Sequence, residues 1–193
     1  VYGDDIRQKL DIYSPLDASS EQQKPVILFV HGGTWQRGDK NQYLFVGESF
    51  TQAGYVVAVM NYRLAPQHVY PDYVQDVVLA VRYLSEHVQQ YGGDPQQLVL
   101  LGHSAGAFNV VAAANDAQFL DSVNVPVSQI KAVVGIAGPY SFVIQEHPDS
   151  IPAFAEDASP DAVMADRRVR ADAPPHLLMI ASTDDLVEHG NTL

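Results

Sequence analysis

The chain has 193 residues, of which 47% are hydrophobic and 18% charged, and its formal net charge is −12. This length and composition predict one globular domain, residues 1–193, with a sizeable core. The negative charge repels phosphate backbones, which argues against nucleic acid as a partner. The absence of cysteine excludes disulfide bonds and thiolate metal sites. No apolar run reaches the length of a membrane span and no secretory signal is recognisable, so we expect a cytoplasmic protein.

Strand-like and helix-like segments alternate along the chain, which predicts a mainly parallel sheet covered by helices on both faces. Residues 7–13 alternate apolar and polar side chains, as an edge strand does. The continuous apolar run 26–30 predicts a strand buried on both faces. A helix over about residues 41–53 ends at Gly54, and residues 55–60 predict the next buried strand.

The second half of the chain continues the same alternation. Asp72 is the predicted N-cap of a long helix, because apolar residues recur at helical spacing up to residue 88. The Gly-Gly-Asp-Pro turn at residues 92–95 ends that helix. The later predicted elements are strands over residues 98–101, 130–136 and 177–181, a helix over residues 105–114, and an aperiodic loop region with a short helix over residues 138–175.

The most specific motif is the G-H-S-A-G sequence at residues 102–106, which stands between an apolar strand and an Ala- and Val-rich helix. In this context a serine hydroxyl is exposed on a strained turn, so Ser104 is the candidate nucleophile for acyl transfer. Both glycines are expected because a side chain at either position would collide with neighbouring backbone. The N–H of Ala105, at the start of the helix, is a candidate oxyanion donor.

A second motif, H-G-G-T-W at residues 31–35, directly follows the buried strand 26–30. The backbone N–H groups of Gly33 and Thr34 are expected to complete the oxyanion hole with that of Ala105. Losing one such donor typically costs about 3 kcal/mol of transition-state stabilisation.

Three further side chains near these motifs are candidates for the substrate pocket. Trp35, His103 and Tyr140 could each shape the acyl pocket, although each could equally be packed as a structural side chain. Four other histidines show no metal-ligand spacing and are interpreted as ordinary polar or capping residues: His68, His87, His147 and His176.

Together with residues 62–66 (Tyr-Arg-Leu-Ala-Pro) and 183–185 (Thr-Asp-Asp), these motifs cover nearly the whole chain. In this order they resemble the α/β-hydrolase superfamily, and within it the carboxylesterase and lipase group that includes hormone-sensitive lipase-like esterases and kynurenine formamidase. The resemblance implies an α/β-hydrolase fold and a Ser–acid–His triad without metal or cofactor. Hormone-sensitive lipase-like enzymes usually carry three glycines in the oxyanion motif, so this two-glycine motif is more similar to kynurenine formamidases and small microbial carboxylesterases.

The resemblance also implies the remaining members of the triad. Asp185, two residues before Val187, matches the family's acid, whereas Asp184 is expected to cap the following turn. The triad order in this fold is Ser, acid, His. His189 lies only four residues after Asp185 and is not expected to reach over the serine. We therefore expect a C-terminally incomplete domain that lacks its last strand, triad histidine and final helix, and is close to inactive alone. The alternative is a naturally short protein without the base.

The function predicted from these residues is hydrolysis of small carboxylic esters through an acyl-enzyme intermediate. The expected partner is a small-molecule ester or amide. One alternative is an arylformamidase, which the two-glycine motif favours. A second alternative is a non-catalytic ligand-binding protein on the same fold, since fold does not fix function.

Overall fold

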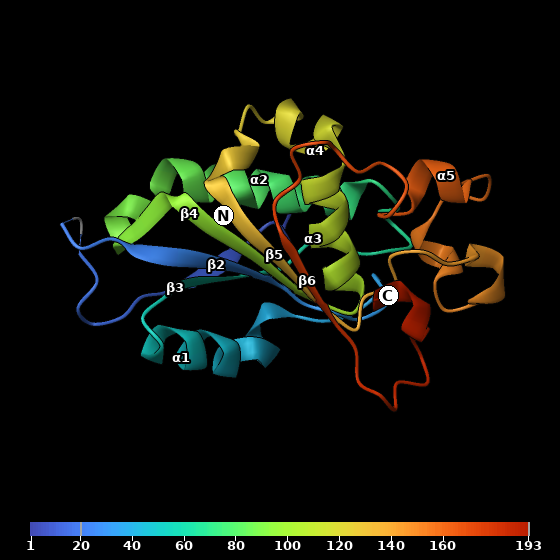
Figure 1. Ribbon diagram of the computed structural model, residues 1–193, viewed down its shortest axis with the longest axis horizontal. Helices are drawn as coiled ribbons and strands as arrows, with labels where there is room; N and C mark the ends of the chain where they lie inside the picture. Colours follow the sequence, from blue (N-terminus) through green and yellow to red (C-terminus); the bar gives the residue numbers. More distant parts are fainter. Residues whose placement is uncertain (20, 193) are drawn as a thin grey trace.

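The computed structural model describes residues 1–19 and 21–192. Within them, six strands form one sheet in the order β1-β3-β2-β4-β5-β6 (Figure 1). β1 pairs antiparallel with β3, and every other pairing is parallel. The strands are β1 (Leu10–Tyr13), β2 (Lys24–Val30), β3 (Val56–Met60), β4 (Gly93–His103), β5 (Ile130–Ile136) and β6 (His176–Met179). The predicted mainly parallel sheet with an N-terminal edge strand is confirmed.

Helices cover both faces of this sheet. One face carries α1, and the opposite face carries α2 and α3 (Figure 1). The α-helices are α1 (Leu44–Gln52), α2 (Asp72–His87), α3 (Ala105–Asn115), α4 (Ala117–Ser122) and α5 (Pro160–Val163). None of the described helices is long and apolar enough to cross a membrane.

The central strands supply side chains to two separate cores. Val26, Leu28 and Val30 of β2 belong to the larger core beneath α2 and α3. Ile27 and Phe29 of the same strand face α1. All five are at most 4% exposed, because successive residues of a strand point to opposite faces and both faces are covered here.

The start of α2 differs from the prediction. Asp72 is the first residue of the helix, and Pro71 occupies the N-cap position without a side-chain cap. The Asp72 carboxylate is held instead by His68 Nδ1 at 2.8 Å and by the Arg63 guanidinium at 3.4 Å. These two partners draw the carboxylate away from the helix N–H groups, so an acidic residue next to a helix start was not enough to identify the cap.

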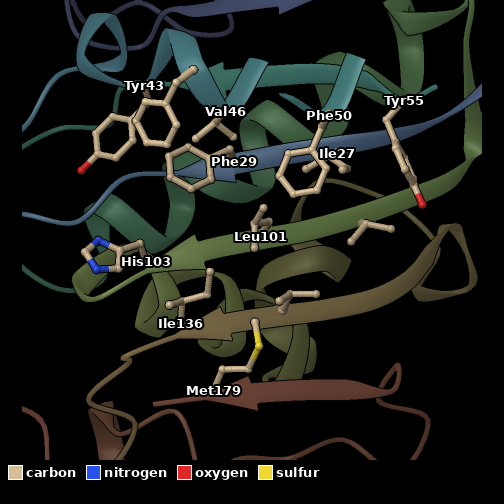
Figure 2. Close-up of a pocket in the computed structure, with 13 residues that line it drawn as sticks. Ile27, Phe29, Tyr43, Val46, Phe50, Tyr55, Leu101, His103, Ile136 and Met179 are labelled. Carbon is tan, nitrogen blue, oxygen red and sulfur yellow. The ribbon is translucent and has the colours of Figure 1, made fainter. Parts of the chain in front are cut away.

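The face of the sheet beside α1 is covered unevenly. α1 packs against β3 and β1, and next to it a cavity of about 570 Å³ opens over β2, β4, β5 and β6 (Figure 2). Its wall is apolar and includes Phe29, Leu101, Ile136 and Met179, with the imidazole of His103 at one end. We call this cavity the apolar groove.

A buried ion pair fixes α2 against the opposite edge of the sheet. Asp76 of α2 is fully buried, and its carboxylate accepts hydrogen bonds from Gln8 Nε2 and from the backbone N–H of Arg63, both at 2.7 Å. The Arg63 guanidinium lies 2.8 Å from the same carboxylate. The pair therefore connects the segments that flank β1 and β3 to α2.

Substitution Asp76→Ala is expected to lower the free energy of unfolding by about 3–5 kcal/mol, because it leaves the half-buried Arg63 guanidinium without its buried partner. Urea denaturation followed by circular dichroism measures this loss. Glu86→Ala on the same helix is the matched control: its carboxylate lies on the surface, 3.8 Å from Arg82 and 3.8 Å from His87, and its removal should cost less than about 1 kcal/mol. Equal losses in the two variants would contradict the assignment.

Candidate active site

The nucleophile candidate lies on a strained corner between β4 and α3. Ser104 has φ 54° and ψ −122°, a conformation that L residues rarely adopt. Its N–H donates to the Ile136 carbonyl of β5 at 2.8 Å, and its carbonyl accepts the first helical N–H, from Ala107, at 2.9 Å. The chain thus passes from strand to helix at this one residue and places its side chain at the carboxyl edge of the sheet.

The two glycines of the motif are required by backbone contacts. A Cβ on Gly102 would overlap the carbonyl oxygen of Gly106, and a Cβ on Gly106 would overlap the carbonyl oxygen of Val30. These overlaps are the collisions that the motif predicts. They also show that α3 packs directly on the end of β2, which brings the serine corner beside the loop that follows β2.

That loop, residues 31–35, runs past the serine in a tight left-handed turn. Gly33, Thr34 and Trp35 have consecutive positive φ angles of 128°, 50° and 58°. A Cβ on Gly32 would lie 2.9 Å from the Cβ of Ser104. The loop and the nucleophile are therefore in direct contact, and only glycine permits the approach at position 32.

The expected oxyanion donors are unengaged. In the described part of the chain, the N–H groups of Gly33 and Thr34 donate to no protein group. The N–H of Ala105 lies at the first position of α3, where a helix provides no acceptor. Thr34 and Ala105 line the same cavity as Ser104, so donors and nucleophile open onto one space.

This cavity has a volume of about 270 Å³ and lies on the other side of the serine corner from the apolar groove. Among the three predicted pocket residues, Trp35 lines it. The structure places His103 in the apolar groove and Tyr140 in a separate cavity beside Leu178 (Figure 2). His103 ends β4, so its side chain and that of Ser104 leave the backbone in different directions. Tyr140 folds back over Gly135 and is 3% exposed.

Residues that the sequence analysis did not select as pocket residues also line the cavity of Ser104, among them Arg37 and His147. Arg37 follows the left-handed loop and is exposed, and the His147 ring packs edge-on against Phe142 at 5.3 Å. His147 belongs to the aperiodic region 138–175, which offers no pattern from which its direction could be predicted. No group of three or more potential metal ligands is found among the described residues.

The segment after β6 forms one wall of the cavity. The Asp184 carboxylate accepts the N–H groups of Leu186 and Val187, each at 2.9 Å, which is the capping role expected for it. Leu186 and Val187 themselves line the cavity, and Asp185 is exposed next to them. The role of Asp185 as the triad acid stays a prediction. The side chain of His189 lies outside what the structure describes.

The chain matches the BD-FAE family over residues 10–192. It belongs to the BD-FAE family. The predicted α/β-hydrolase fold and the carboxylesterase and lipase group are thereby confirmed.

Curated relatives of this BD-FAE protein are named as esterases. It is 36% identical over 149 residues to the probable isoprenylcysteine alpha-carbonyl methylesterase ICMEL1 of Arabidopsis thaliana, covering 74% of this chain and 31% of that protein. It is 31% identical over 212 residues to esterase LipC of Mycobacterium tuberculosis, covering 97% of this chain and 51% of that one. The chain thus spans about a third to a half of the length of these relatives.

Solved structures show the same fold. Esterase 2 of Thermogutta terrifontis, phosphoramylated by tabun, superposes with a TM-score of 0.80 at 25% identity, covering 99% of this chain and 73% of that one. The propionate-bound form of the same esterase has a TM-score of 0.79 at 24% identity, covering 94% and 70%.

A buried histidine supports the left-handed loop in this BD-FAE protein. His31 is fully buried and stacks on Tyr62 with ring centroids 4.5 Å apart. Its Nδ1 lies 2.7 Å from the Gly32 carbonyl oxygen, so the neutral ring donates its N–H there. Burial lowers the pKa of His31 to about 4. The imidazole is therefore neutral at pH 7 and supports the loop through its stacking and its hydrogen bond.

The low pKa of His31 predicts a pH-dependent stability. Below its ordinary pKa of 6.5 the unfolded chain binds a proton at this residue, whereas the folded protein does so only near pH 4. Above pH 6.5 the neutral His31 therefore contributes about 3 kcal/mol to the free energy of unfolding. This contribution is lost as the pH falls from 6.5 to 4. Urea unfolding of wild type and His31→Gln between pH 7 and 4.5 measures it. A stability loss in His31→Gln as steep as in wild type would refute the prediction.

Proposed function

We propose that this protein hydrolyses small carboxylic esters through an acyl-enzyme on Ser104. The observation that carries the proposal is that one cavity is lined both by Ser104, which has a positive φ, and by residues whose backbone N–H groups have no acceptor. Membership of the BD-FAE family and similarity to proteins named as esterases support it. The same features suit acyl transfer because they supply a nucleophile and charge stabilisation where the reaction needs them.

In the proposed reaction the Ser104 Oγ attacks the ester carbonyl carbon while its proton passes to a base. The carbonyl oxygen becomes an oxyanion and accepts hydrogen bonds from the N–H groups of Gly33, Thr34 and Ala105. Collapse of this intermediate breaks the bond to the alcohol, which leaves with the proton. Water then attacks the acyl-serine by the same route, releasing the carboxylic acid and restoring the hydroxyl.

The proton relay is the least complete part of the site. Asp185 is the proposed acid, at the edge of the cavity wall formed by residues 186–188. Three described histidines, His31, His68 and His176, form hydrogen bonds through a ring nitrogen. Their partners are Gly32, Asp72 and Pro174, and none of these hydrogen bonds involves Ser104. We therefore propose that residues 1–193 by themselves hydrolyse esters poorly.

A small acyl group fits the proposed site best. The cavity of about 270 Å³ is walled on its apolar side by Trp35, Pro139 and Phe142. Such a volume suits short acyl chains rather than long ones. The structural relative from Thermogutta terrifontis has been solved with propionate and with butyrate, which supports this choice.

Ser104→Ala is expected to abolish both p-nitrophenyl butyrate hydrolysis and labelling by a fluorophosphonate, because it removes the attacking oxygen. The protein encoded by the complete gene is the material for this test, with gel fluorescence and intact mass as readouts. The matched control is Ser150→Ala, which removes another serine hydroxyl from the wall of the same cavity and should retain labelling.

The assignment of the nucleophile is wrong if Ser104→Ala is labelled as strongly as wild type. Assaying N-formylkynurenine beside the ester identifies the bond that is cleaved. A formamide rate above the ester rate would replace the ester proposal by the arylformamidase alternative. The absence of both activities and of labelling would favour the ligand-binding alternative.

Residues 1–193 expressed alone are expected to show a kcat/KM at least about a hundredfold below that of an esterase with a complete triad, since a positioned base contributes 10²–10⁴-fold. Esterase 2 of Thermogutta terrifontis, assayed in parallel with p-nitrophenyl butyrate, is the reference. Turnover within tenfold of that reference, lost in Ser104→Ala, would show that the described residues already contain the base.

A further inference from the structure

Helix α3 carries one polar side chain in the middle of its apolar surroundings. All residues of α3 are buried, and Asn109 has no exposed surface at all. It lies five residues after Ser104, between Phe108 and Val110 of the main core. An amide in this position loses its hydration on folding and needs a partner within the protein.

That partner comes from the left-handed loop. The indole Nε1–H of Trp35 donates to Asn109 Oδ1 at 2.8 Å, across 74 residues of sequence. An indole N–H can only donate, so the amide oxygen must face Trp35. Asn109 Nδ2 then points elsewhere and has no hydrogen-bond partner among the described residues. The amide oxygen of Asn109 is therefore hydrogen-bonded to the loop, whereas its amide nitrogen has no hydrogen-bond partner among the described residues.

Trp35 holds the loop in a conformation that it would not keep unaided. Thr34 and Trp35 are consecutive non-glycine residues with positive φ, which persists only where surrounding contacts enforce it. The Trp35 side chain is 1% exposed and meets Phe108 and Phe154 edge-on at 5.4 and 5.2 Å. The ring also stacks on Tyr73 at 5.8 Å and on Phe142 at 6.3 Å, and the hydrogen bond directs its N–H toward α3.

A leucine at position 109 would fill the same space and remove the unpartnered amide N–H₂ group, but it would leave the buried Trp35 indole N–H without its acceptor. The asparagine therefore contributes to the stability of the core through this one hydrogen bond. What it adds is a fixed link between α3, which carries Ser104 and the Ala105 N–H, and the loop that carries the other two donors.

We propose that Asn109 is a positioning residue, which sets the oxyanion donors of the loop relative to Ser104 by orienting Trp35. The proposal rests on the proposed esterase function. It assigns Asn109 no contact with substrate: its effect passes through the indole. Since a misplacement of about 1 Å at a reacting site can reduce the rate a hundredfold, loss of the link acts on the chemical step more than on substrate binding.

The test uses Asn109→Leu in the protein encoded by the complete gene. We expect kcat for p-nitrophenyl butyrate to fall about tenfold, with KM within twofold. The urea midpoint should also fall, because the buried indole N–H loses its acceptor. The indole N–H resonance of Trp35, identified by its loss in Trp35→Phe, reports the hydrogen bond directly and should move upfield in Asn109→Leu. Asn115→Leu, which removes another buried asparagine from α3, is the matched control and should leave kcat and the resonance unchanged.

A double-mutant cycle separates orientation from general damage to the core. In a Trp35→Phe background, which lacks the indole N–H, Asn109→Leu should reduce kcat by less than twofold further. An unchanged kcat in Asn109→Leu, or an equal loss in both backgrounds, would overturn the positioning role. Failure of the proposed function is distinct from either result, because the wild type would then hydrolyse no ester while the indole resonance still moved in Asn109→Leu.

Discussion

The parallel pairing of β2 with β4 is the interaction on which the candidate site depends. Val30 and Gly102 are register partners at the ends of these neighbouring strands, so the loop after β2 and the serine corner after β4 leave the sheet side by side. The glycine at position 106 lets α3 approach the carbonyl oxygen of Val30. One strand pairing and one missing Cβ thereby bring the oxyanion donors to the nucleophile. This agrees with the general rule that sites in open α/β sheets form beyond the carboxyl ends of the strands.

Strained backbone is concentrated at this junction. Thr34, Trp35 and Ser104 all have positive φ, and such residues cost of order 1–3 kcal/mol each. The surrounding structure offsets this cost through buried groups: the Trp35 ring in its aromatic cluster and the neutral His31 stacked on Tyr62. The rigid parts of the site are therefore the parts that need a fixed geometry, namely the donors and the serine corner.

The two faces of the sheet play different parts. The face under α2 and α3 holds the larger core, against which the helix that follows Ser104 packs, and the buried Asp76 pair, which holds α2. The face beside α1 holds the apolar groove, into which His103 points. The adjacent residues His103 and Ser104 therefore line different cavities: His103 lines the apolar groove, and Ser104 lines its own cavity.

The sequence by itself determined the order of the elements, the mainly parallel sheet and the serine corner with its glycines, because hydrophobic period and close backbone contact are local properties that a pattern reveals. Only the tertiary structure decided that Asn109 meets Trp35, that Tyr140 folds over Gly135, and that His147 lines the cavity of Ser104. Each of these contacts joins segments far apart in sequence, or lies in the aperiodic region 138–175. The directions of these side chains depend on tertiary packing, which the sequence of a single segment does not determine.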